Sequence, residues 1–264
     1  MRTQHLVRIL GVAAAYCIGF LPPASAVDAT VADTSGQSIT LRDVSFGDGN
    51  RTEPFFKLHL RRPGKESRGE SVELSLALAS LKEVAVDPTV KGERGYRAPV
   101  VVTLVDGTQY RGEAGGQLRG ENELGKGSLE TNKLAKAVFT RAAGDADYAP
   151  ESGVVRGRMA EKGGNSFDIV SLTSGQGSDA TAQIECSVGE VKFSIPIENI
   201  TGIEHIGEVK REYSTEPKLR LTLASGRTIE ITTSSGRHLR AHFKHGIAEV
   251  PFELLANATL EKKK

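Results

Sequence analysis

The stretch VKFSIPIENITGIEHI, residues 191–206, determines how the rest of the chain is interpreted. Its apolar residues recur first at a spacing of two, as at Phe193 and Ile195. The spacing then changes to three, at Ile200 and Ile203. A spacing of two is typical of a β-strand, and the change is typical of a tight turn or one turn of 3₁₀ helix. We therefore expect a strand, a turn and a second strand.

Three other segments repeat this layout, at residues 72–86, 127–139 and 246–260. The first of them lies at a constant separation from the opening stretch, since Leu81 matches Ile200 and 200 − 81 = 119. The other two follow the same apolar pattern and end in the same way. One layout that occurs four times indicates internal repetition.

Two predicted β-hairpins show the same separation. Residues 100–113 alternate apolar and polar residues on both sides of an Asp-Gly turn, and residues 219–232 do so around a Ser-Gly turn. Glycine takes a positive φ without a Cβ clash, which suits such a tight turn. Leu104 and Leu223 hold matching positions, and 223 − 104 = 119. Two distant segments that share one separation indicate duplication of a whole block.

These patterns predict an all-β fold, with tandem repeats of small β-barrel or sandwich units arranged as two duplicated blocks. We expect a signal peptide at residues 1–26, a first block at 27–141, a linker at 142–165 and a second block at 166–264. Each block is expected to hold two units, at about 28–87 and 98–140 and at about 168–206 and 217–261. Within the linker, Val154 and Val155 suit an edge strand. The alternative is that alternating strands resemble one another by chance.

The hairpins and closing segments together resemble the small-barrel layout of SH3-like and Sm-like domains. The residues that carry the resemblance are 103–110 with 127–139, and 222–229 with 247–260. An apolar-Pro-apolar motif opens the closing segment at Pro196 and Pro251, and Ala77 and Glu130 replace the proline in the other two units. The resemblance implies a 3₁₀ turn between the last two strands of a unit. It carries over no binding residue.

The first 26 residues have the pattern of a secretory leader. Arg2 and Arg8 provide positive charge, residues 9–21 are apolar, and Ala24-Ser25-Ala26 fits a cleavage site. The alternative is an amphipathic first helix. We therefore expect an exported protein, periplasmic or extracellular, with no later membrane span.

Charge and cysteine content restrict the classes of partner. The 34 basic and 33 acidic residues become 32 and 33 without Arg2 and Arg8, so electrostatic attraction to nucleic acid is not indicated. Without the leader, Cys186 is the only cysteine, which excludes an internal disulfide. Its alternation with Ile184 and Val188 favours a buried structural cysteine over a reactive thiol.

The densest polar cluster is residues 237–245, RHLRAHFKH. As a strand it turns Leu239, Ala241 and Phe243 inward. The opposite face then carries a basic stripe, and the candidate residues for binding an anionic partner are Arg237, His238, Arg240, His242 and Lys244. The alternative is a solvated sheet face that is neutralised by acidic neighbours such as Glu230.

A metal site in this cluster is not expected. On a strand, His238 and His242 share a face but lie about 13 Å apart, too far to ligate one ion, and His245 points the other way. We predict no metal and no cofactor.

The sequence contains none of the phosphate-loop, metal-helix or nucleophile-elbow motifs, so we predict no catalytic residue and leave enzymatic activity open. The leading hypothesis is an exported, non-enzymatic binding or scaffolding protein of the bacterial cell envelope that contacts a protein or an envelope polymer through its β units. One alternative is an anionic-polymer or polysaccharide binder that uses the basic stripe, although the 5% aromatic content without Trp argues against sugar stacking. Another is an envelope hydrolase with an unrecognised site.

Overall fold

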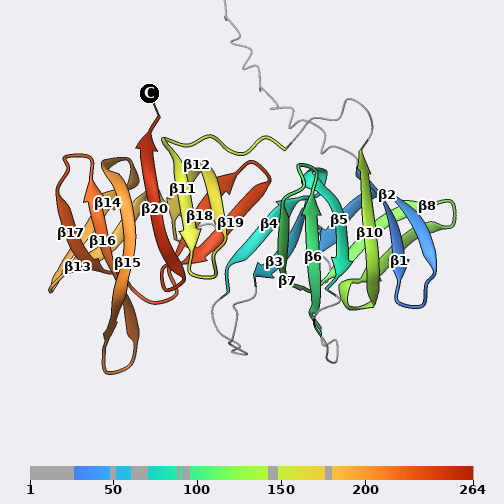
Figure 1. Cartoon of the computed structure of the whole chain (residues 1–264), viewed down its shortest axis with the longest axis horizontal. Helices are drawn as coiled ribbons and strands as arrows, with labels where there is room; N and C mark the ends of the chain where they lie inside the picture. The colour runs from blue at the N-terminus through green and yellow to red at the C-terminus, as the bar shows by residue number, and fades with distance from the viewer. Residues whose placement is uncertain are drawn as a thin grey trace, which may run out of the picture.

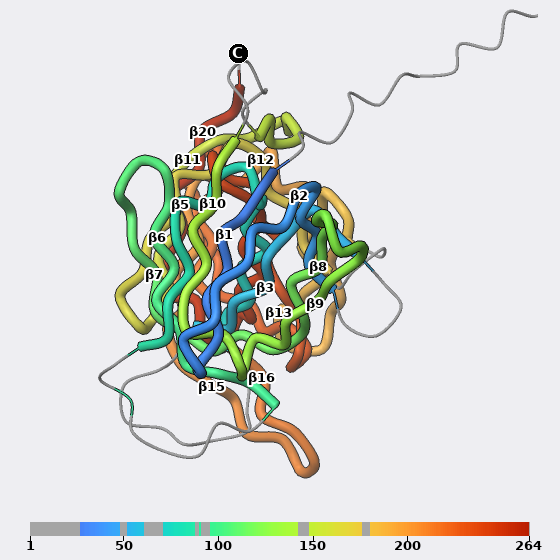
Figure 2. The backbone as a smooth tube through the Cα atoms, turned by 90° about the vertical axis from the view of Figure 1, so that its right-hand side faces the viewer, coloured from blue at the N-terminus to red at the C-terminus, as the bar shows by residue number. Residues whose placement is uncertain are grey.

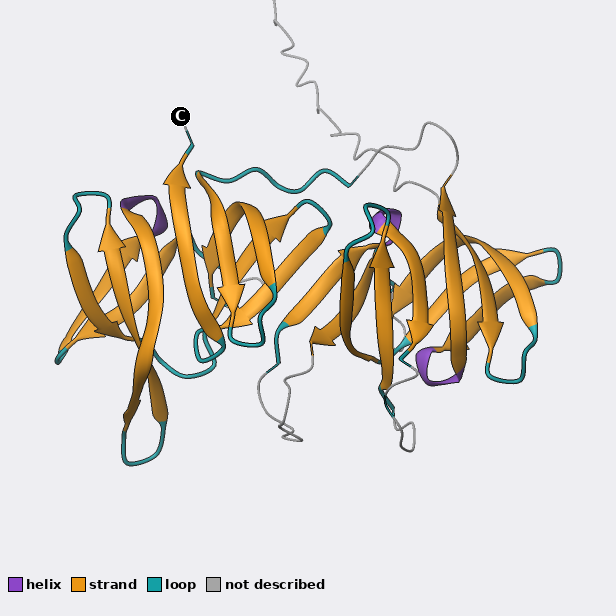
Figure 3. Cartoon of the chain, viewed as in Figure 1, coloured by secondary structure: helices purple, strands orange, loops and turns teal. Residues whose placement is uncertain are grey.

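The fold is all-β, with three single turns of 3₁₀ helix and no α-helix in the residues that the structure describes (Figure 3). The structure, a computed structural model, describes residues 27–47, 52–60, 71–87, 90, 96–141, 148–175 and 180–263. The expected leader, residues 1–26, lies outside this part of the chain.

Ten strands and two 3₁₀ turns form the N-terminal half. They are β1 (Val27–Asp33), β2 (Ser38–Gly47), β3 (Phe55–Leu60), β4 (Glu73–Ala77), η1 (Leu78–Ser80), β5 (Leu81–Val86), β6 (Ala98–Leu104), β7 (Gln109–Ala114), β8 (Gln117–Asn122), β9 (Gly125–Glu130), η2 (Thr131–Lys133) and β10 (Leu134–Arg141).

Ten further strands form the C-terminal half. They are β11 (Val155–Glu161), β12 (Ser166–Ser174), β13 (Gln183–Val188), β14 (Val191–Pro196), η4 (Ile197–Asn199), β15 (Ile200–Lys210), β16 (Thr215–Leu223), β17 (Thr228–Thr232), β18 (His238–Phe243), β19 (Gly246–Pro251) and β20 (Leu255–Lys262).

All twenty strands join into one open antiparallel sheet. In the N-terminal half the order of paired neighbours is β9-β8-β2-β1-β10-β5-β6-β7-β3-β4. In the C-terminal half it is β19-β18-β12-β11-β20-β15-β16-β17-β13-β14. Adding ten to every strand number converts the first order into the second.

The two halves meet where β4 pairs with β19. Figure 1 shows them side by side along the long axis, with β3, β4, β18 and β19 in the middle. Among the described strands, β9 and β14 pair on one side only, so they are the two edges of the sheet. They belong to opposite ends of the molecule, because β8, the partner of β9, lies at one extreme of Figure 1 and β13 and β14 lie at the other.

The pattern that opened the sequence is reproduced by the structure. Residues 191–206 form β14, η4 and the start of β15, and Pro196 is the last residue of its strand. The hairpins expected around the Asp-Gly and Ser-Gly turns are β6–β7 and β16–β17. In the fourth segment a hydrogen-bonded turn, not a 3₁₀ turn, separates β19 from β20.

Two boundary expectations need correction. The predicted linker, residues 142–165, contains β11, which is an interior strand between β12 and β20 and not an edge strand. No hairpin was predicted in the first unit, but β1 and β2 form one. Both were missed because glycines and acidic residues interrupt the apolar alternation there, while tertiary pairing still supplies partners for the backbone.

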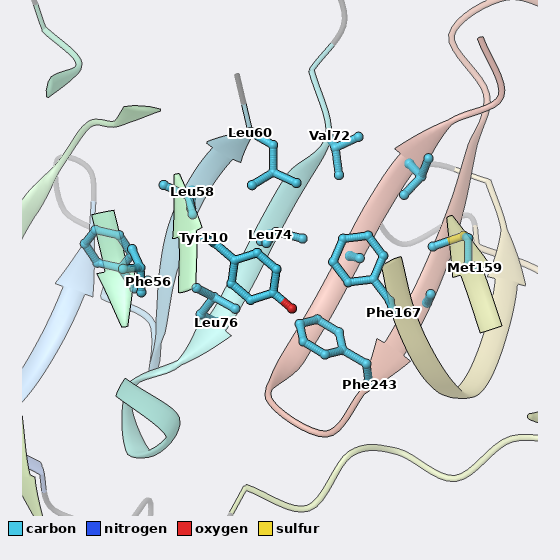
Figure 4. Close-up of a cluster of buried hydrophobic side chains, with 14 of the residues drawn as sticks. Phe56, Leu58, Leu60, Val72, Leu74, Leu76, Tyr110, Met159, Phe167 and Phe243 are labelled. Atoms are coloured by element: carbon cyan, nitrogen blue, oxygen red, sulfur yellow. The ribbon is translucent and has the colours of Figure 1, made fainter. Parts of the chain in front are cut away.

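The hydrophobic core is continuous across the junction of the halves. Figure 4 shows Leu74, Leu76 and Tyr110 of the N-terminal half facing Phe167 and Phe243 of the C-terminal half. The rings of Tyr110 and Phe167 stack with centroids 6.2 Å apart, and those of Phe167 and Phe243 are 5.4 Å apart. Burial raises the pKa of Tyr110 to about 12. These packed rings hold the halves together in addition to the backbone pairing.

Polar contacts also cross the junction. The Nε2 atom of His245 lies 2.6 Å from the Oδ2 atom of Asp106, and Lys244 Nζ lies 3.6 Å from the same oxygen. The amide of Thr108, more than the His245 contact, holds the pKa of Asp106 well below its usual value. The amide of Ala77 donates to the carbonyl of His245. Asp106 of the predicted hairpin tip therefore binds the turn between β18 and β19.

Replacing Phe167 with alanine is expected to lower the free energy of unfolding by about 3–5 kcal/mol, because it leaves a cavity between two aromatic rings in the core. The matched control is Ile39→Ala in β2. Ile39 holds the position in its half that Phe167 holds in the other, but its side chain is 42% exposed, so the expected loss of unfolding free energy is about 1 kcal/mol. Urea unfolding followed by circular dichroism measures both. Equal losses would contradict a junction-specific role for Phe167.

Candidate binding surfaces

The predicted basic stripe lies on β18 and the residues that flank it. Leu239, Ala241 and Phe243 point into the core, with exposed fractions of 0%, 0% and 3%, as the strand alternation predicts. Arg237, His238 and Arg240 are half-buried, His242 is buried and Lys244 is exposed. The structure therefore places all five on one segment but gives them very different access to solvent.

Four of the five residues of the stripe have an acidic neighbour. Arg240 Nη1 lies 3.4 Å from Glu249 Oε1, and His242 Nε2 lies 3.8 Å from Glu151 Oε2. Arg237 forms an ion pair with Glu185. Lys244 faces Asp106, as described above.

Nearby carboxylates therefore offset most of the charge of the stripe, as the alternative of a neutralised sheet face expects, but His242 is buried and not solvated. Those carboxylates do not include Glu230, which was the expected neighbour. Its carboxylate pairs with Lys218 at 2.6 Å and with Arg220 at 3.4 Å.

His242 adds little positive charge to this surface near neutral pH. Burial lowers its pKa below the usual value, and the nearby Arg240 acts in the same direction. The Nδ1 atoms of His238 and His242 are buried without a hydrogen-bond partner among the described residues. In the same part of the chain, no group of three or more His, Cys, Asp or Glu residues is placed to hold a metal ion.

A second surface, which the sequence did not single out, is the free edge strand β14. Val191 and Phe193 are 58% and 47% exposed, and Val188 at the end of β13 is 42% exposed. Both Val191 and Phe193 belong to the strand-turn-strand stretch at 191–206. Their side chains alternate as in a buried strand, but none of the described strands covers them.

A cavity of about 490 Å³ lies beside this edge. It forms where β13 meets β17 through a single residue pair, Ser187 with Thr232. Phe193 lines it from β14, and Cys186 lines it from β13. Cys186 is a free thiol, 6% exposed, and burial raises its pKa, in agreement with a structural role. Arg237 of the predicted stripe also lines this cavity.

The N-terminal half has a cavity of about 320 Å³ beside the matching strands β3 and β7. Its charged residues are Glu53, Lys57 and Arg97, and His59 also lines it. The cavity beside β13 and β17 carries two acidic and two basic residues, Glu185, Glu216, Lys192 and Arg237. The two linings therefore differ, although each contains both acidic and basic groups.

Comparisons with known proteins give no further direction. No family model matches the chain, and no curated protein and no solved structure is similar to it. Within the described ranges, the chain has no helix with the length and apolar composition needed to cross a membrane.

Sequence reasoning missed β14 as a surface for a definite reason. In residues 72–86 the matching strand, β4, has the same alternation, and its apolar residues are buried. Alternation reports which residues share a face of a strand. It does not report whether the strand has a neighbour on each side. Only the strand order distinguishes β14 from β4.

Acidification is expected to destabilise the protein through His59. Burial, together with Arg97, lowers the pKa of His59 to about 4, below the value of about 6.5 in an unfolded chain. Because the unfolded chain then binds the proton first, the stability present above pH 6.5 is lost as the pH falls towards 4. Urea unfolding at pH 7.5, 6 and 4.5 measures the loss. His59→Gln should reduce it, and an unchanged pH dependence in that variant would show that other groups cause it.

Proposed function

We propose that this chain is an exported, non-enzymatic scaffolding protein of the bacterial cell envelope that binds other protein chains through its β units. The observation that carries the proposal is the free edge of β14, which combines unpaired backbone with exposed Val191 and Phe193. An edge of this kind can receive an extended strand from a partner, with backbone hydrogen bonds for affinity and side-chain contacts for specificity. The leader-like pattern of residues 1–26 supports export.

We further propose that the sheet arose by duplication of a ten-strand block. The support is the identical strand order of the halves and the equivalence of their registers: Val31 faces Ile39 as Met159 faces Phe167, and Val84 faces Ala137 as Ile203 faces Ala258. Duplication explains why one pattern occurs repeatedly in the sequence.

Within each block, we propose two small-barrel units that exchange strands and stay open. The group β9-β8-β2-β1-β10 takes two strands from the first unit and three from the second. The group β5-β6-β7-β3-β4 takes the remaining ones. The 3₁₀ turns η1 and η2 separate the last two strands of each unit, as the resemblance to SH3-like and Sm-like domains implies.

The scaffolding proposal is favoured over binding of an anionic polymer because the carboxylates beside the stripe already neutralise it. An anionic ligand would have to displace Glu249 from Arg240 and Asp106 from Lys244. The edge of β14 has no such internal competitor among the described residues.

Co-purification from the envelope fraction of the native host tests the choice. Changing Val191 and Phe193 to lysine places charges along the edge and is expected to abolish recovery of protein partners. Both side chains are about half exposed, so the fold should survive, which circular dichroism checks. The matched variant Arg240→Gln with Lys244→Gln removes two charges of the stripe and is expected to leave recovery unchanged. Loss of partners only in the stripe variant would reverse the assignment.

A further inference from the structure

The junction between the halves provides a template for pairing an edge strand. Glu249, Ala248, Ile247 and Gly246 of β19 face Glu73, Leu74, Ser75 and Leu76 of β4. A Cβ atom on Gly246 would overlap the carbonyl oxygen of Ser75, so the close approach of the strands needs glycine there. Backbone pairing and side-chain packing both contribute to this contact.

The two free edges of the sheet correspond to the two strands of this junction. In the strand order, β14 occupies the place of β4, and β9 occupies the place of β19. The hairpin β8–β9 pairs Asn122 with Gly125 in the way that β18–β19 pairs Phe243 with Gly246. Each end of the molecule therefore presents one side of a contact whose complete form exists at its centre.

On the β14 side, the side chains that are exposed correspond to side chains that the junction buries. Val72 and Leu74 are 2% and 0% exposed, and their counterparts Val191 and Phe193 are 58% and 47% exposed. Leu60, which is 6% exposed, corresponds to Val188, which is 42% exposed. The β14 side thus keeps apolar side chains at positions that a strand paired with β14 would bury.

The β9 side shows the same relation. Phe167 is 1% exposed at the junction, and its counterpart Ile39 is 42% exposed. His245 is 6% exposed in the turn between β18 and β19, and Leu124, in the same position of the turn between β8 and β9, is 86% exposed. Thus five of the nine large apolar side chains exposed in the described chain are counterparts of buried junction residues. Exposed apolar groups that gather at defined sites mark interaction surfaces.

The register of the internal junction can be transferred to the two edges without conflict. It places Gly125 opposite Ile195, Lys126 opposite Ser194, Gly127 opposite Phe193 and Ser128 opposite Lys192. Lysine on an edge strand commonly discourages pairing, but Lys126 and Lys192 would each lie opposite a serine and meet no like charge. Gly125 has no atom of the chain within 4 Å of where its Cβ would lie, so the space that Ser75 occupies beside Gly246 is open here.

We propose that copies of this chain join head to tail, with β14 of one copy pairing with β9 of the next as β4 pairs with β19 inside each copy. This inference rests on the proposed duplication and on the proposed role of β14, and it specifies a second copy as the partner. The contact joins two different surfaces, so it is heterologous and produces a ring or a filament. The edges belong to opposite ends of the long axis, as Figures 1 and 2 show, with β8 and β9 together at one end.

Sedimentation velocity of the purified protein over a concentration series tests this assembly with three variants. The first, Val191→Lys with Phe193→Lys, blocks the β14 edge. The second, Ile39→Lys with Leu124→Lys, blocks the β9 edge. The control is Tyr213→Lys, which changes a side chain that is 91% exposed in the loop between β15 and β16 and has no counterpart at the junction.

The unmodified chain and the Tyr213→Lys variant are expected to form species larger than dimers as concentration rises. Each edge variant alone should remain monomeric, because every head-to-tail contact needs both edges. An equimolar mixture should form dimers and nothing larger, since it offers one intact β14 edge and one intact β9 edge per pair. This result would identify the contact as heterologous.

Two results would overturn the inference. An unmodified chain that stays monomeric at every concentration would exclude self-association. A dimer formed by either edge variant alone would show pairing of identical edges. In both cases, partner recovery that still depends on Val191 and Phe193 in the envelope experiment would leave the proposed function standing. If self-association is absent and partner recovery also no longer depends on Val191 and Phe193, both proposals are rejected.

Discussion

The pairing of β4 with β19 is the contact on which the whole molecule depends. A sheet satisfies the backbone groups of its interior strands, but each edge strand keeps a row of unpaired groups. The junction converts two such edges into interior strands and buries the apolar side chains beside them. Phe167, Phe243 and Tyr110 then pack into one core that continues across both halves. Without this contact, each half would expose an edge lined with apolar groups, as β14 is now.

Several charged groups lie beside the junction of the halves and pair with one another there. Asp106 extends from the tip of the β6–β7 hairpin to His245 and Lys244, so the most distinctive basic cluster in the sequence contributes partly to holding the halves together. Arg237 and Arg240 pair with Glu185 and Glu249 on neighbouring strands. A cluster that stands out in the sequence for its charge is thus largely balanced by its surroundings. The apolar edge of β14, by contrast, has no neighbouring group among the described residues that covers it.

The two halves share a strand order but differ in the residues that line their cavities. Glu53, Lys57, His59 and Arg97 line one cavity, whereas Glu185, Lys192, Glu216 and Arg237 line its counterpart. The strands that carry these residues keep the same order and register in both halves. Strand order and register are therefore alike in the two halves, while the cavity linings differ.

The sequence by itself determined the all-β class, the strand-turn-strand segments and both Gly-containing hairpins, because apolar spacing and turn chemistry are local properties. It also determined the inward face of β18 and the burial of Cys186. It did not determine that residues 155–161 form an interior strand, or that Val191 and Phe193 remain exposed while Val72 and Leu74 are buried. Those facts depend on which strand lies alongside, and the neighbours of β4 and β14 come from distant parts of the chain. Alternation fixes the face on which a side chain lies, and only the tertiary structure decides whether that face is covered.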